Sequence, residues 1–134
     1  MQIDDQRIKH LEFIQAIIAR LAGNSFLMKG WTVTLVAALF ALAAKDANRN
    51  FMVVAFLPAI CFWGLDAYYL RQERIFRALY TSCIRQDCEI PIFSMDTSKV
   101  ESSVANWAQT LFDCVVVFYH APVVASIAAA MCFL

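Results

Sequence analysis

Three long apolar stretches, at residues 26–44, 51–70 and 114–134, most constrain what this chain can fold into. A helix needs about 20 mainly apolar residues to cross the hydrocarbon core of a bilayer, and each stretch is close to that length. The chain is 61% hydrophobic and only 16% charged, whereas soluble domains average about half apolar and a quarter charged residues. The sequence therefore predicts an all-α membrane protein with three transmembrane helices. Residues 26–70 would form a transmembrane hairpin and residues 114–134 the third helix.

The segment before the hairpin, residues 1–25, is expected to form an amphipathic helix that is too polar to cross a membrane. Its apolar residues fall on one helical arc. They are Leu11, Ile14, Ile17, Ile18 and Leu21. This helix is expected either to lie along the membrane or to pack on cytoplasmic helices. Gly23, Asn24 and Ser25 interrupt the pattern, and Asn24 or Ser25 can cap the helix that follows.

Residues 71–113 are expected to form a cytoplasmic helical region in which the second apolar helix continues beyond the membrane. The apolar face of this extension contains Ile75, Phe76, Leu79, Tyr80, Cys83 and Ile84. Residues 86–98 are expected to be irregular. The spacing of Ser98 and Glu101 is that of a capping box, so it predicts that another amphipathic helix begins there. The buried side of that helix would contain Val100, Val104, Trp107 and Leu111.

Lysine and arginine are distributed unequally along the chain. Of the 11 such residues, four lie at or before residue 29 and five lie between the second and third apolar stretches. The turn at residues 45–50 contains the other two. Loops rich in Lys and Arg stay on the cytoplasmic side of a membrane. The count predicts an N-terminus inside and a C-terminus outside, which three crossings satisfy.

Lys29 and Asp66 carry opposite charges within the first two apolar stretches. An antiparallel pair of helices joined near residues 47 and 48 brings these two positions to the same level. A charge inside a membrane segment is costly unless it is paired or faces a polar path. Two interpretations follow: an ion pair that sets the register of the hairpin, which we favour, or a ring of such residues at the mouth of a pore in an oligomer.

Three further polar residues, Thr32, Thr34 and His120, lie inside the predicted spans. His120 is expected to form a hydrogen bond across helices. A proton relay is the weaker alternative, because Asp113 is the only other titratable residue near this span in the sequence. Thr32 and Thr34 could turn polar groups toward the interior of the bundle, or could bond to their own backbone.

The cytoplasmic extension of the second helix presents a basic face. It contains Arg71, Arg74, Arg77 and Arg85. Three interpretations are open. The favoured one is contact with anionic lipid headgroups, worth about 1 kcal/mol for each arginine close to the surface. The others are pairing with acidic side chains of neighbouring cytoplasmic segments, and binding of an anionic ligand such as a nucleotide.

Signatures of catalysis and of metal binding are not apparent in the sequence. Of the five cysteines, only Cys83 and Cys88 are close together, and a structural zinc site normally has four Cys or His ligands with tighter spacing. No nucleophile elbow, phosphate loop or metalloprotease motif occurs. A net charge of zero provides no basic field for nucleic acid. We therefore expect no enzyme activity, no metal, no cofactor and no nucleic-acid partner.

Small residues recur four apart in all three apolar stretches. They are Ala37 and Ala41, then Ala55 and Ala59, then Ala121, Ala125 and Ala129. Such faces let membrane helices approach closely, because helix contact in a bilayer depends on packing. The pattern favours a compact bundle and self-association.

The stretches at residues 29–32 (Lys-Gly-Trp-Thr) and 62–71 (Phe-Trp-Gly-Leu-Asp-Ala-Tyr-Tyr-Leu-Arg), with the helix that follows, resemble the SLATT-type effectors of bacterial antiviral systems. The resemblance covers residues 26–96, and this chain differs by its third span. It implies a homo-oligomer that permeabilises the bacterial inner membrane once a partner senses infection. The expected function is therefore a pore-like or membrane-perturbing effector in contact with anionic lipids. The alternative is an accessory subunit that anchors or regulates a larger protein.

Overall fold

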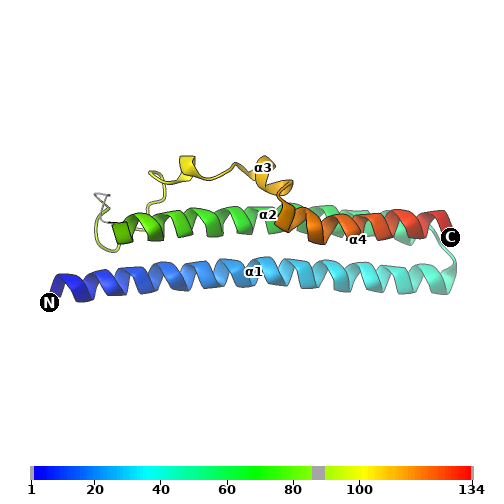
Figure 1. Cartoon of the computed structure of the whole chain (residues 1–134). Coiled ribbons are helices and arrows are strands. Elements are labelled where there is room, and N and C mark those ends of the chain that lie inside the picture. Colours follow the sequence, from blue (N-terminus) through cyan, green and yellow to red (C-terminus); the bar gives the residue numbers. More distant parts are fainter. Residues whose placement is uncertain (1, 86–89, 134) are drawn as a thin grey trace.

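A computed structural model describes residues 2–85 and 90–133, and within these ranges the regular structure is entirely helical (Figure 1). The elements are α1 (Gln2–Asp46), α2 (Asn50–Arg85), the short 3-10 helix η1 (Glu101–Ser103), α3 (Trp107–Leu111) and α4 (Cys114–Phe133). Helices α1, α2 and α4 are long and apolar enough to cross a membrane. The prediction of an all-α chain with three such helices is confirmed. These helices keep large apolar residues exposed on their surface. Leu57 is 68% exposed and Phe118 is 85% exposed.

The long helix α1 contradicts the predicted break between residues 1–25 and the first apolar stretch. It runs without interruption through Gly23, Asn24 and Ser25. A glycine inside a helix costs about 1 kcal/mol relative to alanine, and this cost is small beside the packing of α1 along α2 on both sides of it. Ser25 does not cap a helix, because its hydroxyl donates to the Asp66 carboxylate.

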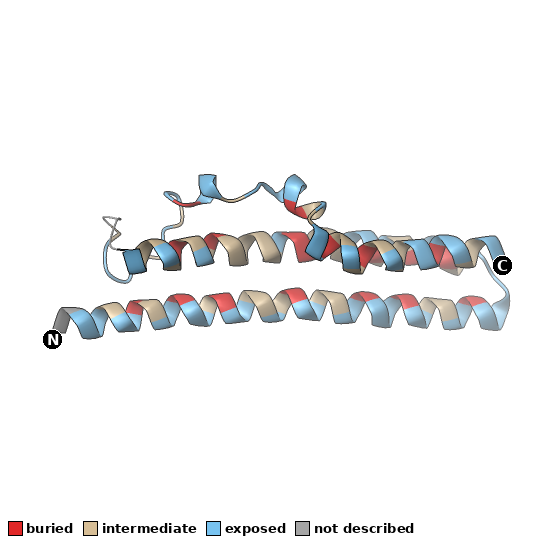
Figure 2. Cartoon of the chain, in the orientation of Figure 1, coloured by how far each residue is buried: buried red, intermediate tan, exposed pale blue. Residues whose placement is uncertain are grey.

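Helices α1 and α2 lie antiparallel, with the start of α1 extending beyond the end of α2, and their buried residues line the facing sides (Figure 2). Two apolar cores lie at different levels of this pair. The first contains Ile14, Ile18, Ile75, Leu79 and Val100. The second contains Val36, Ala55, Ala59 and Ile127. The apolar face of residues 1–25 thus packs on the extension of α2, which was one of its two expected positions.

Helix α4 packs beside α2 at the second core, where the small side chains of Ala55 and Ala59 let it approach closely. Arg49, in the turn between α1 and α2, donates to the carbonyl of Met131 at 2.8 Å, in the last turn of α4. A cation at a helix C-terminus also interacts favourably with the helix dipole. Helix α4 therefore ends at the level of this turn, opposite to the end at which α1 begins (Figure 1).

The segment between α2 and α4 contradicts the predicted helix over residues 98–113. Only η1 and the five-residue α3 are helical there, and the capping box is formed by Asn106 and Gln109. The predicted capping pair has other partners: Asp96 accepts from the Ser98 backbone N–H at 2.9 Å, and Glu101 binds Arg71. Local side-chain bonds of this kind compete with helix formation.

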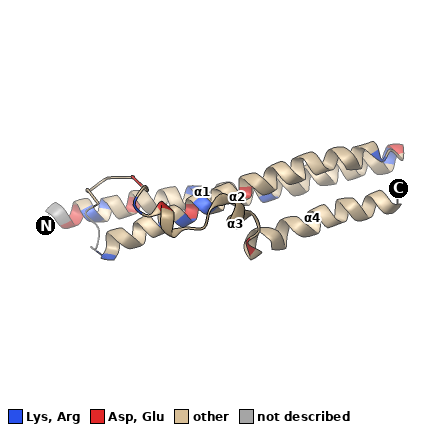
Figure 3. Cartoon of the chain, turned by 90° about the horizontal axis from the view of Figure 1, so that it is seen from above, with Lys and Arg blue, Asp and Glu red and all other residues tan. Residues whose placement is uncertain are grey.

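Charged residues gather in the half of the molecule that contains the start of α1 (Figure 3). A smaller group, Lys45, Asp46 and Arg49, surrounds the turn between α1 and α2. The long helices between these two groups are largely uncharged. Lys29 and Asp66 lie within this apolar part, at the border of the larger charged group.

Candidate functional site

Asp66 lies at the centre of a buried polar cluster that contains Ser25, Lys29, Asp66 and His120, which we call the Asp66 cluster. The Asp66 side chain has no exposed surface. Lys29 Nζ lies 2.8 Å from Oδ1 and 2.6 Å from Oδ2. The Ser25 hydroxyl donates to Oδ1, and His120 Nε2 lies 2.8 Å from Oδ2. Both carboxylate oxygens are thus fully engaged by neighbouring side chains.

The cluster ties together all three long helices between the two apolar cores. Ser25 and Lys29 are one turn apart on α1, Asp66 is on α2 and His120 is on α4. Lys29 Nζ also donates to Ser25 Oγ at 3.1 Å. The structure therefore brings Lys29 and Asp66 together, and it adds two partners to the pair.

His120 forms the cross-helix hydrogen bond expected of it, for which the sequence had indicated no partner. Its partner is Asp66 on α2, whereas Asp113, considered only for a proton relay, binds Arg74. Because a carboxylate only accepts, His120 Nε2 must carry the proton and donate it. The Trp63 ring stacks on the imidazole at 5.9 Å between centroids, with 9° between the planes. His120 Nδ1 is buried and has no hydrogen-bond partner among residues 2–85 and 90–133.

Tyr119 adds a direct contact between α4 and α1 beside the cluster. Its hydroxyl donates to the carbonyl of Lys29 at 2.9 Å. Its ring lies 5.8 Å from Lys29 Nζ, within the range of a cation–π contact. Lys29, with a side chain that is 21% exposed, is thus held by α1, α2 and α4 together.

Ser25 is the member of the cluster that sequence reasoning missed, since it was assigned to a helix cap. Its position four residues before Lys29 places both on one face of a continuous helix, and that spacing is the signal that could have found it. The Ser25 hydroxyl is buried and donates to a carboxylate. It therefore supplies one of the hydrogen bonds that hold the Asp66 carboxylate.

Thr32 and Thr34 bond to their own helix, which was the second of their two expected roles. The Thr32 hydroxyl donates to the Met28 carbonyl at 2.7 Å, and the Thr34 hydroxyl donates to the Gly30 carbonyl at 2.9 Å. Each bond reaches back four residues along α1. Neither threonine belongs to the Asp66 cluster.

Three of the four arginines on the basic face of α2 bind acidic side chains of this chain, which was one of the three interpretations. Contact with lipid headgroups stays a prediction. Arg71 pairs with Glu101 at 3.1 Å and donates to the Ala105 carbonyl. Arg74 pairs with Asp113 at 3.0 Å, and Arg77 pairs with Glu73 at 2.7 Å. Arg85 is exposed at the end of α2. The contacts of Arg71 and Arg74 hold the segment between α2 and α4 against α2, whereas the Arg77–Glu73 pair lies within α2.

We expect Arg74→Gln to raise the pKa of the Asp113 carboxyl. The Arg74 guanidinium and the Val115 backbone N–H both donate to this carboxylate and lower its pKa. Because the pKa is lowered in the folded state, the contact stabilises the fold above the unfolded value of about 3.9. That stabilisation is lost as the pH falls through the folded pKa.

Carboxyl-carbon NMR of the protein in micelles, recorded over a pH series, measures this Asp113 midpoint. Asp96 is the matched control, since Ser98 rather than Arg74 lowers the pKa of its carboxyl. The Asp96 midpoint is expected to stay constant. An Asp113 midpoint that Arg74→Gln leaves in place would contradict the assigned cause.

No group of three or more His, Cys, Asp or Glu residues within the described ranges is placed to hold a metal ion. Cys88, one half of the cysteine pair noted in the sequence, lies outside those ranges. No family model matches the chain, and no curated protein and no solved structure matches it either.

Proposed function

We propose that this chain is a bacterial inner-membrane protein that assembles with copies of itself into a pore-like or membrane-perturbing effector of the antiphage type. The observation that carries the proposal is the outward face of α1. Gly30, Thr34, Ala37 and Ala41 are all exposed there. Their spacing places them on one side of the helix, whereas the buried Thr32 and Val36 lie on the other side, toward α2. Small-residue faces are the surfaces through which helices associate in a bilayer.

A second small-residue face supports assembly into a closed ring. Ala125 and Ala129 are exposed on α4, whereas the third pair, Ala55 and Ala59, is used inside the protomer. A contact between α1 of one copy and α4 of the next is heterologous, and such contacts generate rings when the rotation closes. One protomer has too few helices to enclose a pore, so conduction needs several copies.

The Asp66 cluster has a structural role in this proposal. Because Asp66 is sealed inside one protomer, it does not line a pore mouth formed between copies. It sets the register of α1, α2 and α4 instead. The proposed orientation, with the N-terminus inside, is supported by the excess of Lys and Arg in the half of the molecule that contains the start of α1.

The alternative function, an accessory subunit that docks a larger partner, is favoured by an exposed apolar patch near the start of α1. Phe13 and Phe93 lie 5.9 Å apart between ring centroids and are both exposed, as is Ile8. Solvent-exposed apolar patches often mark interaction sites. The arginines proposed for this docking are, however, mostly paired within the chain.

Gly30→Leu tests the proposed assembly. A Cβ added at Gly30 meets no atom within 4 Å, so the protomer accommodates the new side chain. The same side chain blocks close approach of another helix, and we expect loss of the oligomer in native mass spectrometry together with loss of ion flux across vesicles. Leu42→Phe is the control, since Leu42 is exposed on α1 but lies off the small-residue face. A wild-type protein that is monomeric and gives no ion flux across vesicles would contradict the effector proposal and favour the accessory role.

A further inference from the structure

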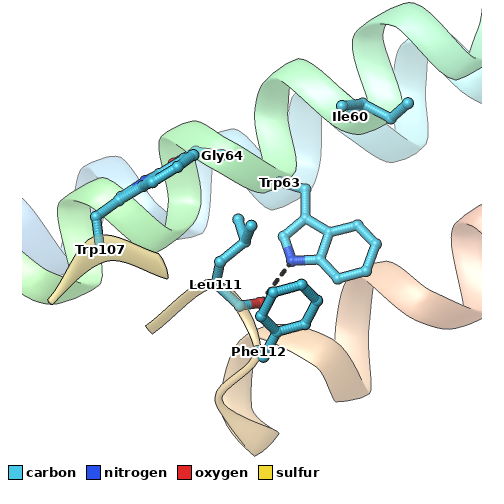
Figure 4. Close-up of a pocket in the computed structure, with 6 residues that line it drawn as sticks. All are labelled: Ile60, Trp63, Gly64, Trp107, Leu111 and Phe112. Atoms are coloured by element: carbon cyan, nitrogen blue, oxygen red, sulfur yellow. Dashed lines mark hydrogen bonds between the residues drawn. The ribbon is translucent and has the colours of Figure 1, made fainter. Parts of the chain in front are cut away.

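An apolar pocket of about 260 Å³ lies between α2 and the segment that leads into α4 (Figure 4). Its walls are formed by Ile60, Trp63, Gly64, Trp107, Leu111 and Phe112. The Asp66 cluster does not contribute to these walls. The pocket is therefore a separate site, although Trp63 belongs to its lining and also stacks on His120.

Two tryptophans join the two sides of the pocket, because each donates a hydrogen bond to the backbone of the opposite segment. Trp63, from α2, donates its indole N–H to the Leu111 carbonyl at 2.9 Å. Trp107, from α3, donates its indole N–H to the Gly64 carbonyl at 3.0 Å. Both indole N–H groups are thus satisfied by backbone, and the rings contribute apolar surface to the walls. Gly64 lets Trp107 lie close, because a Cβ added there would already be 3.4 Å from its ring.

The pocket opens onto the apolar outer surface of the molecule. Ile60 and Phe112, at its rim, are 60% and 72% exposed. Leu57 and Val115, next to them along α2 and α4, are exposed as well. In a bilayer this surface faces hydrocarbon rather than water. An apolar cavity does not hold water well, because water needs two to four polar partners.

We propose that this pocket binds one acyl chain of a bilayer phospholipid. Its volume lies just below the usual range of about 300–1,000 Å³ for sites that enclose a drug-sized ligand, which suits part of a single chain. Its apolar lining suits hydrocarbon and not a headgroup. Because Trp63 contacts both the pocket and His120, a bound chain supports the ring that packs on the Asp66 cluster. The inference rests on the proposed membrane location, but not on assembly of several copies.

Quenching of tryptophan fluorescence by brominated phospholipids tests this proposal. The chain has three tryptophans, and Trp31→Phe leaves only the two that line the pocket. In this background the full-length protein is reconstituted into phosphatidylcholine vesicles with increasing fractions of chains brominated near the middle. A bound chain should give quenching that saturates at low brominated fraction, above the quenching expected from random lipid contact.

Ile60→Phe should fill the pocket and remove this excess quenching. Leu57→Phe makes a similar change on the same exposed face of α2, outside the pocket, and should leave the excess in place. Ile60→Ala, which widens the pocket, should also retain it, and it keeps the test valid if the larger side chain disturbs folding. Equal quenching in Ile60→Phe and Leu57→Phe overturns the acyl-chain site alone. An absence of any quenching by brominated lipid overturns the membrane location as well.

Discussion

Asp66→Asn is expected to destabilise the folded chain by about 3 kcal/mol, near the lower end of the cost of breaking a buried ion pair. The Asp66 carboxylate accepts from Ser25, Lys29 and His120 at once. An amide has one acceptor oxygen, and its nitrogen is a donor. Asparagine therefore cannot replace both carboxylate oxygens as hydrogen-bond acceptors. Lys29 would be left with its charge largely buried and unpaired. Its partial exposure, at 21%, reduces the cost because the ammonium can reach toward the surface.

Thermal or denaturant unfolding in detergent, followed by circular dichroism, measures this loss. The double variant Lys29→Met with Asp66→Leu should recover part of the stability, because an apolar pair can replace a buried ion pair at little cost. The recovery is incomplete because Ser25 and His120 lose their acceptor. Thr32→Val is the matched control for a buried polar residue, since its hydroxyl bonds only to its own helix. A single Asp66→Asn variant as stable as the wild type would contradict the assigned role of the cluster.

His120→Leu is expected to be the second most damaging change, at about 1.5–3 kcal/mol, the value of a hydrogen bond to a charged group. It removes the contact through which α4 joins the Asp66 carboxylate, and it removes the partner on which Trp63 stacks. In the His120→Leu variant, we expect amide hydrogen exchange to accelerate more in α4 than in α1. His120→Gln, which retains a donor at the end of the side chain, should recover part of the lost stability.

Hydrogen exchange read by mass spectrometry separates a local effect on α4 from a global one. A double-mutant cycle with Asp66→Asn then gives the coupling energy between the two residues, which should be well above zero for side chains in direct contact. Uniformly faster exchange in all three helices would contradict a local docking role for His120. Additive effects in the cycle would show that the two side chains do not act together.

Much of the helical framework could be predicted from the sequence, because long apolar stretches have few stable alternatives to helices. The errors lie where local signals compete with tertiary contacts. Gly23 interrupts the pattern locally, yet α1 continues because α2 packs along both parts of it. Ser98 and Glu101 have the spacing of a helix start, yet Glu101 binds Arg71 instead. In both places a contact from a distant part of the chain decides the outcome.

The Asp66 cluster likewise contains one part that the sequence predicts and one part that depends on tertiary contacts. The sequence by itself determined that Lys29 and Asp66 lie level, because a short turn between two antiparallel helices fixes their register. Only the tertiary structure decided that His120 completes the cluster. The segment between α2 and α4 is long and mostly irregular, so no local pattern fixes where α4 packs. Its position is set by side-chain packing against Ala55 and Ala59, by the Arg49 contact to its last turn, and by the hydrogen bond of His120 to Asp66 itself.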